Sequence, residues 1–251
     1  MHLDKRDFRD LLFKVGKRSL ELAFPSSIYC ICCGNLIDPS RIYALCDDCL
    51  QNLRWANERT CGKCGKALEN ERKNELCHDC QQNVHWFERG FTCMQYGTKE
   101  KEILHRFKFN GAAYMGSKLG KIMLDRILLE ELKIDFVTAV PMHKKKQAKR
   151  GYNPAELMAK EVAKGLCVPY NGQVLKRNYY KAPMNKLDRN QRKLNLIDSY
   201  SASVLYDIHG KSILLIDDVY TTGSTADECS KALKEAGADN VFVLTLAAGV
   251  N

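Results

Sequence analysis

An acidic pair followed by a small, hydroxyl-rich loop is the chemically most informative part of the chain. Asp217 and Asp218 end an apolar run, Ile213–Ile216, that is typical of a strand buried on both faces. The loop after them contains Thr221, Thr222, Gly223, Ser224 and Thr225. A helical pattern starts there, so free N–H groups and the helix dipole would favour an anion. Because carboxylates accept hydrogen bonds from sugar hydroxyls, the pattern predicts a site for a phosphorylated sugar. The alternative is an ordinary strand-to-helix turn with an acid before the cap.

Eight of the twelve cysteines form two copies of one motif, Cys-x2-Cys-x12-Cys-x2-Cys, with the second copy 31 residues after the first. The two sets are Cys30, Cys33, Cys46, Cys49 and Cys61, Cys64, Cys77, Cys80. Two cysteines two residues apart make a tight turn whose sulfurs face one point, and four thiolates complete the tetrahedral shell of Zn²⁺. We therefore expect two structural zinc sites with four cysteine ligands each.

Other chemistries of paired cysteines are redox exchange and iron–sulfur ligation. Two matched twelve-residue loops are more than redox exchange needs, and four ligands leave no open position for a catalytic zinc. Two pairings of the motifs are open at this point. Sequential ribbons fit the repeat best, and an interleaved cross-brace is the alternative.

Positive charge is concentrated in one segment. Residues 144–193 contain 14 Lys or Arg against three acids, a net charge of +11 in a chain whose total is +9. Such a local field attracts phosphates, either pyrophosphate or nucleic acid. Lys144 and Arg150 lie in a predicted loop directly after a predicted strand, where cations can bind pyrophosphate. The alternative is a mobile, solvated basic loop without a ligand.

The elements that must position these residues alternate between strands and helices. The pattern predicts helices at 5–23, 99–109, 115–132, 154–164 and 225–236, strands at 91–96, 136–140, 213–216 and 241–246, and mostly irregular chain at 174–198. This order implies an α/β fold with a mostly parallel sheet flanked by helices. Ligands of such sheets bind beyond the carboxyl ends of the strands, so the ends at 140 and 216 belong to one site. The predicted domains are an amphipathic helix at 1–27, a small double zinc ribbon at 28–82 and an α/β domain at 88–251.

The distribution of apolar residues argues against a membrane-spanning protein and against a secreted one. No apolar run approaches the roughly 20 residues of a transmembrane helix, and the first ten residues lack the apolar core of a signal peptide. We expect a cytoplasmic protein without membrane insertion. Thiols stay reduced in the cytoplasm, which favours metal ligation over disulfides.

The acid pair and its loop closely resemble the signature of type I phosphoribosyltransferases, which bind phosphoribosyl pyrophosphate (PRPP). Residues 20–248 resemble the ComF family of bacterial competence proteins, in which a cysteine zinc ribbon precedes a phosphoribosyltransferase domain. The matching pieces are Phe24-Pro25, Phe107-Lys108-Phe109 with Gly111, Val140-Pro141, Arg150-Gly151-Tyr152-Asn153, Arg192 with Asn195, and Ile216–Thr225.

The resemblance implies a type I phosphoribosyltransferase-like domain in which Asp217 and Asp218 contact the ribose as the catalytic residues. Thr221–Thr225 would hold the 5′-phosphate, with Mg²⁺ accompanying PRPP. It also implies a role in handling single-stranded DNA during natural transformation, with a competence helicase as a partner. Two alternatives stay open: a transferase that passes ribose 5-phosphate to an unidentified acceptor, and a PRPP-sensing regulator without turnover.

Overall fold

The computed structural model describes residues 28–57, 59–68, 75–178 and 199–249. The chain divides into two compact units, residues 1–52 and residues 53–251. The predicted helix at 5–23 and the part of the cationic segment 144–193 that follows residue 178 lie outside the described residues. Within the described part of the chain, no helix has both the length and the apolar character needed to cross a bilayer.

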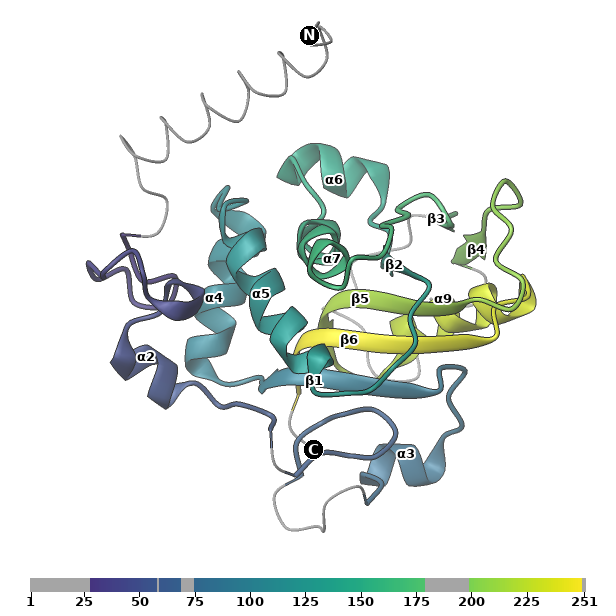
Figure 1. The fold of residues 1–251 in the computed structure, drawn as a ribbon, viewed down its shortest axis with the longest axis horizontal. Helices are drawn as coiled ribbons and strands as arrows, with labels where there is room; N and C mark the ends of the chain where they lie inside the picture. Colours follow the sequence, from purple (N-terminus) through teal and green to yellow (C-terminus); the bar gives the residue numbers. More distant parts are fainter. Residues whose placement is uncertain (1–27, 58, 69–74, 179–198, 250–251) are drawn as a thin grey trace, which may run out of the picture. The chain divides into compact units, whose positions relative to one another are not determined.

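A four-stranded parallel sheet forms the centre of the second unit (Figure 1). Its strands, in spatial order, are β1 (Arg89–Gln95), β6 (Asn240–Ala248), β5 (Ser212–Tyr220) and β2 (Phe136–Ala139). In the register of β5 with its two neighbours, Ile216 is paired with Ala139 of β2 and Asp217 with Thr245 of β6. The carboxyl ends of β2 and β5 therefore meet at one edge of the sheet, and the predicted α/β fold with a parallel sheet is confirmed.

Helices cover both faces of this sheet. They are α5 (Met115–Leu128), α7 (Pro154–Gly165) and α9 (Ser224–Glu235), while α4 (Thr98–Phe109) follows β1 in the chain. Helices α5 and α7 pack on each other, α5 on β1 and β6, and α7 on β2 and β5. Helix α9 packs on β5, β6 and a small antiparallel ribbon of β3 (Leu175–Arg177) and β4 (Tyr200–Ala202).

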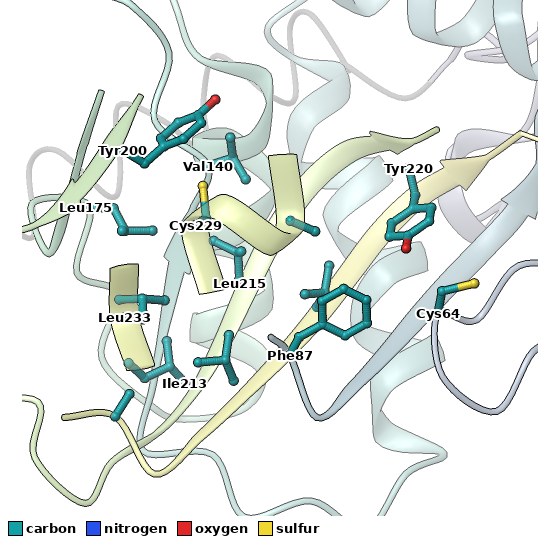
Figure 2. Close-up of a cluster of buried hydrophobic side chains, with 14 of the residues drawn as sticks. Cys64, Phe87, Val140, Leu175, Tyr200, Ile213, Leu215, Tyr220, Cys229 and Leu233 are labelled. Atoms are coloured by element: carbon teal, nitrogen blue, oxygen red, sulfur yellow. The ribbon is translucent and has the colours of Figure 1, made fainter. Parts of the chain in front are cut away.

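The buried strands explain why both faces need a cover. Ile213 and Leu215 join one apolar cluster with Cys229 and Leu233 of α9 (Figure 2). Leu214, between them, is equally buried. Successive side chains of a strand point to opposite faces, so Leu214 faces the helices on the other side. This is why the sequence shows a continuous apolar run there rather than an alternating one.

Two segments differ from the sequence expectation. The predicted basic loop contains helix α6 (Lys144–Arg150), because the His143 side chain accepts the Lys145 N–H at its start and Gly151, at φ +88°, ends it. Lysine and arginine are also good helix formers. Within the segment predicted to be irregular, Leu175–Arg177 forms β3, because it pairs with the three residues of β4 in an antiparallel ribbon.

The two cysteine motifs fold alike. Each begins with an isolated antiparallel bridge, Tyr29 with Leu36 in the first copy and Thr60 with Ala67 in the second. A short helix carries the last cysteine of each copy, α2 (Asp47–Asn52) and α3 (His78–Gln82). The first copy also has a 3-10 turn, η1 (Ile42–Ala44). The 31-residue sequence repeat is therefore a structural repeat.

Candidate functional site

A cavity of about 420 Å³ opens beyond the carboxyl ends of β2 and β5. The acid pair contributes to its wall, as do the end of α4, the segment that follows β2, and the start of α9. Its lining residues are Lys108, Phe109, Val140, Pro141, Met142, Lys146, Arg150, Asn153, Arg177, Tyr200, Asp217, Asp218, Val219, Thr221 and Thr225. Val140, directly after β2, and the acid pair Asp217 and Asp218 thus line one site, as the sequence predicts. Strand β5 itself continues through the acid pair to Tyr220, past the predicted end at 216.

The two carboxylates of the acid pair have different environments. Asp218 accepts a hydrogen bond from Lys108 Nζ at 2.8 Å and forms an ion pair with it. Asp217 Oδ1 accepts the backbone N–H of Asp218 at 2.8 Å. Burial, and then the charge of Asp218, raise the pKa of Asp217 to about 7, although the Asp218 N–H and the cations Lys108 and Arg177 act in the opposite direction. One carboxyl of the pair is therefore poised to change charge near neutral pH.

Four cations face the acid pair: Lys108, Lys146, Arg150 and Arg177. Burial and then the charges of Arg150, Arg177 and Lys108 lower the pKa of Lys146. Burial also lowers the pKa of Arg150. Positive groups that repel one another in the same cavity are stabilised when an anion binds between them, because the anion offsets their repulsion.

Two of these cations stack on aromatic rings at the cavity wall. The Arg150 guanidinium lies 4.9 Å from the ring centroid of Phe109, and that of Arg177 lies 5.4 Å from the ring of Tyr200. Stacking holds a planar guanidinium in place while its N–H groups stay available to an anion.

The predicted phosphate loop joins β5 to α9. Gly223, at φ +78°, precedes the first residue of α9, and the Thr222 and Ser224 hydroxyls lie 2.9 Å apart. Only a glycine adopts that backbone conformation without strain. Thr221 and Thr225 line the cavity, so the N-terminus of α9 and the acid pair contribute to the same space.

Lys144 and Arg150 have different positions. Arg150 lines the cavity, whereas Lys144 is not among the lining residues. Lys146 was missed, although it lies four residues before Arg150 and therefore on the same face of α6. Recognising α6 as a helix would have identified it. Lys108 was also missed as a partner of Asp218, since no sequence pattern links two residues 110 positions apart.

Each cysteine set converges on one point. The four sulfurs of Cys30, Cys33, Cys46 and Cys49 all lie within 4.8 Å of one another, and so do those of Cys61, Cys64, Cys77 and Cys80. The pairing is therefore sequential, and the interleaved cross-brace is wrong. The Cys33–Cys46 and Cys64–Cys77 sulfur distances are both 3.7 Å.

These distances fit zinc. A tetrahedral shell with Zn–S bonds of about 2.3 Å places its sulfurs about 3.8 Å apart. Backbone N–H groups also point at the sulfurs: Cys46 N lies 3.4 Å from Cys30 Sγ, and Cys77 N lies 3.3 Å from Cys61 Sγ. Such contacts stabilise thiolates and orient metal ligands.

Comparison with known proteins agrees with these features. Residues 19–81 match the double zinc ribbon domain family. The chain is 29% identical to competence protein F of Haemophilus influenzae over 151 residues, which cover 58% of this chain and 66% of that protein. It is 26% identical to the DNA utilization protein YhgH of Escherichia coli, with 64% and 72% covered, and 28% identical to competence protein ComFC of Bacillus subtilis, with 57% and 56% covered.

The resemblance to the ComF competence proteins is confirmed. Among solved structures, the chain is similar to a glutamine PRPP amidotransferase from B. subtilis complexed with ADP and GMP. The TM-score is 0.37 at 24% identity, over 54% of this chain and 26% of that chain. It is also similar to a Thermus thermophilus protein, TT1426, with a TM-score of 0.33 at 13% identity, over 54% of this chain and 83% of that one.

Proposed function

We propose that the cavity beyond β2 and β5 binds PRPP together with Mg²⁺. One observation carries the proposal: an acid pair, a helix N-terminus and four cations line a single cavity. PRPP has a matching set of groups, namely a ribose diol, a 5′-phosphate and a pyrophosphate. No simpler phosphate ester needs all three features.

Each part of the site has a role in this proposal. Asp217 and Asp218 accept hydrogen bonds from the ribose hydroxyls. The loop Thr221–Thr225 and the free N–H groups at the start of α9 bind the 5′-phosphate. Lys146, Arg150 and Arg177 neutralise the pyrophosphate, and Lys108 orients Asp218 through their 2.8 Å ion pair.

The residues present also suit Mg²⁺. This ion prefers carboxylate and phosphate oxygens and binds through one or two carboxylates plus the phosphates of a substrate. Asp217 and Asp218 offer such oxygens at the cavity wall. Bound Mg²⁺ would add positive charge at the pyrophosphate, which the cations of the cavity supplement.

Zinc binding by the two cysteine sets is part of the same proposal. The sulfur geometry and the match to the double zinc ribbon domain family support it. Both sets have four ligands, which assigns zinc a structural rather than a catalytic role.

The names of the relatives give the proposed biological context. They describe competence and DNA utilization. We propose that this protein handles single-stranded DNA in the cytoplasm during DNA uptake, with a competence helicase as a partner. The net charge of +11 in residues 144–193 supports binding to a nucleic-acid backbone.

Catalytic turnover of PRPP is the second candidate. It is favoured by the position of Lys146, Arg150 and Arg177, because cations there would stabilise pyrophosphate as it leaves the ribose. Release of pyrophosphate in the presence of a panel of nucleobases distinguishes a transferase from a protein that binds or senses PRPP without turnover.

Calorimetric titration of the full chain with PRPP and Mg²⁺ tests the proposal. Replacing both acids, Asp217→Asn and Asp218→Asn, should weaken binding by about 100-fold, as expected for two lost hydrogen bonds to charged groups. Zinc content should stay near two per chain, which shows that the variant is folded. Lys146→Ala should also weaken binding, whereas the matched variant Lys144→Ala should not. Absence of PRPP binding by the wild-type chain, or wild-type affinity in the double variant, would refute the proposal.

A further inference from the structure

His85 lies between the second cysteine set and the start of α9. Its Nε2 lies 3.3 Å from Cys80 Sγ, and its Nδ1 lies 2.8 Å from Asp227 Oδ2. The side chain is almost fully buried, with 3% of its surface exposed. A buried ring with a partner at each nitrogen has a fixed orientation, so its position depends on both partners.

Asp227 connects His85 to the phosphate loop. Its second carboxylate oxygen accepts the backbone N–H of Trp86 at 3.1 Å. Its own backbone N–H donates to the carbonyl of Gly223 at 2.8 Å, in the first turn of α9. The carboxylate therefore joins the chain at 85–86 to the helix start that we assign to the 5′-phosphate.

The loop itself packs against the same side chains. A side chain added at Gly223 would collide with the Tyr220 hydroxyl and would lie 3.4 Å from His85 Cε1. Phe87 stacks on His85 at 4.9 Å between ring centroids and meets the edge of Tyr220 at 6.3 Å. In Figure 2, Tyr220, the last residue of β5, lies next to Phe87 and Cys64.

The second cysteine set belongs to the same apolar cluster. Its members Cys61, Cys64, Cys77 and Cys80 are buried together with Phe87, Tyr220 and Ala226. The Lys66 ammonium lies 5.6 Å from the ring of Tyr220 and 3.0 Å from Asp79 in α3. The cysteine loop therefore contacts Tyr220, the residue immediately before Thr221–Thr225, and shares a buried cluster with Ala226, the residue immediately after it.

We propose that His85 is a positioning residue that couples the second cysteine centre to the phosphate loop. The inference rests on the proposed PRPP site. Zinc bound by the four thiolates would fix Cys80 Sγ, Cys80 fixes the imidazole, and the imidazole fixes Asp227 at the start of α9. Hydrogen bonds of this kind around a metal typically change affinity or activity by 10–100-fold when they are removed. Among the described residues of the first unit, 28–52, there is no histidine that could form an equivalent link from the first cysteine set.

The test compares His85→Ala with His78→Ala in the full chain. His78 is an exposed histidine in α3, between Cys77 and Cys80, and its Nε2 lies 3.0 Å from the Gln82 amide. Four quantities are measured for each variant. They are the zinc content per chain, the affinity for ribose 5-phosphate with Mg²⁺, the affinity for pyrophosphate with Mg²⁺, and the hydrogen exchange of residues 221–228. For His85→Ala we expect two zinc ions, ribose 5-phosphate binding weakened by about 10-fold, unchanged pyrophosphate binding, and faster exchange at 221–228. His78→Ala should match the wild type in every measurement.

The selective loss distinguishes positioning from general damage, because unfolding would remove pyrophosphate binding as well. Wild-type binding of ribose 5-phosphate and unchanged exchange at 221–228 in His85→Ala would overturn the inference. If His85→Ala does not fold, Asp227→Asn decides: it keeps an oxygen for the Trp86 N–H and alters the group that faces His85. Wild-type behaviour of that variant would overturn the inference, and the same selective loss would support it. If the wild type binds neither PRPP nor ribose 5-phosphate, the proposed function fails, and the exchange rates at 221–228 still decide the coupling.

Discussion

The two cysteine sets have the same local structure and different surroundings. The equivalent hydrogen bonds, Cys46 N to Cys30 Sγ and Cys77 N to Cys61 Sγ, differ by only 0.1 Å in length (3.4 and 3.3 Å). In the first set Cys33 is exposed, whereas all four cysteines of the second set are buried. The second set shares its apolar cluster with residues of β5 and α9.

The glycines after the second cysteine of each set show the same difference. Gly34 and Gly65 both have positive φ, +80° and +75°. A Cβ at Gly34 would have nothing within 4 Å, whereas a Cβ at Gly65 would lie 2.5 Å from the carbonyl oxygen of Gly90 in β1. The repeated motif therefore specifies the metal shell, and the surrounding chain specifies whether that shell is part of a larger core.

The division of the chain follows this difference. The compact units separate between Asn52 and Leu53, which places the second cysteine set in the unit that holds the sheet. The boundaries proposed from sequence, with one double ribbon at 28–82 and an α/β domain at 88–251, stay a prediction. Limited proteolysis of the zinc-loaded chain would show which division holds.

The largest effect is expected from removing one metal ligand in each set. Cys64→Ser should destabilise the whole second unit by on the order of 5 kcal/mol, because metal binding supplies folding free energy to the core that contains it. Cys33→Ser should release zinc and increase hydrogen exchange only within residues 28–52. Zinc content and exchange across both units check this. If Cys33→Ser and Cys64→Ser increased hydrogen exchange in β5 equally, the proposed difference between the two cysteine sets would be contradicted.

A smaller effect is expected from the glycine pair. Gly34→Ala should cost about 1 kcal/mol, the strain of a left-handed backbone conformation in a residue with a Cβ. Gly65→Ala should cost about 3 kcal/mol, since the Cβ must also displace the backbone of β1. Urea unfolding of the second unit and local exchange in residues 28–52 measure the two costs. A Gly65→Ala variant as stable as Gly34→Ala would mean that the second cysteine set is not packed on β1.

The smallest effect concerns pH and should involve only the second unit. Asp217 has a pKa near 7, above that of an ordinary aspartate, because it is buried beside Asp218. In our proposal its ionised form accepts hydrogen bonds from ribose, so PRPP affinity should rise by about tenfold between pH 6 and pH 8. The same ionisation lowers the stability of the fold as pH rises through this range, because the folded chain holds the proton more tightly. Calorimetry across this range measures the affinity. In Asp217→Asn, PRPP affinity should change with pH only as far as the phosphates of the ligand titrate. If the variant keeps the pH dependence of the wild type, a group other than Asp217 is responsible for it.

Local patterns predicted most of the elements. Apolar runs and helical periodicity located all four strands of the parallel sheet and helices α4, α5, α7 and α9, because the buried residues are consecutive in these strands and recur every three to four positions in these helices. The spacing of the cysteines predicted the two sulfur sets, since each turn is formed by neighbouring residues. The acid pair and Thr221–Thr225 were found because strand, loop and helix start follow one another along the chain.

Interactions between distant segments were not predictable in this way. Lys108 reaches Asp218 across 110 positions, and His85 reaches Asp227 across 142. The sequence also gave no sign that one cysteine set is fully buried and the other only in part, because their ligands and spacings are identical. That difference depends on residues such as Gly90 and Tyr220, which lie outside the motif.

Hydrogen exchange of the full chain with and without PRPP and Mg²⁺ tests the central claim most directly, because it locates the ligand within the molecule. We expect slower exchange in residues 217–227 and 141–153 and no change in residues 28–52. Unchanged exchange at 217–227 under saturating PRPP, or slower exchange confined to other segments, would contradict the account.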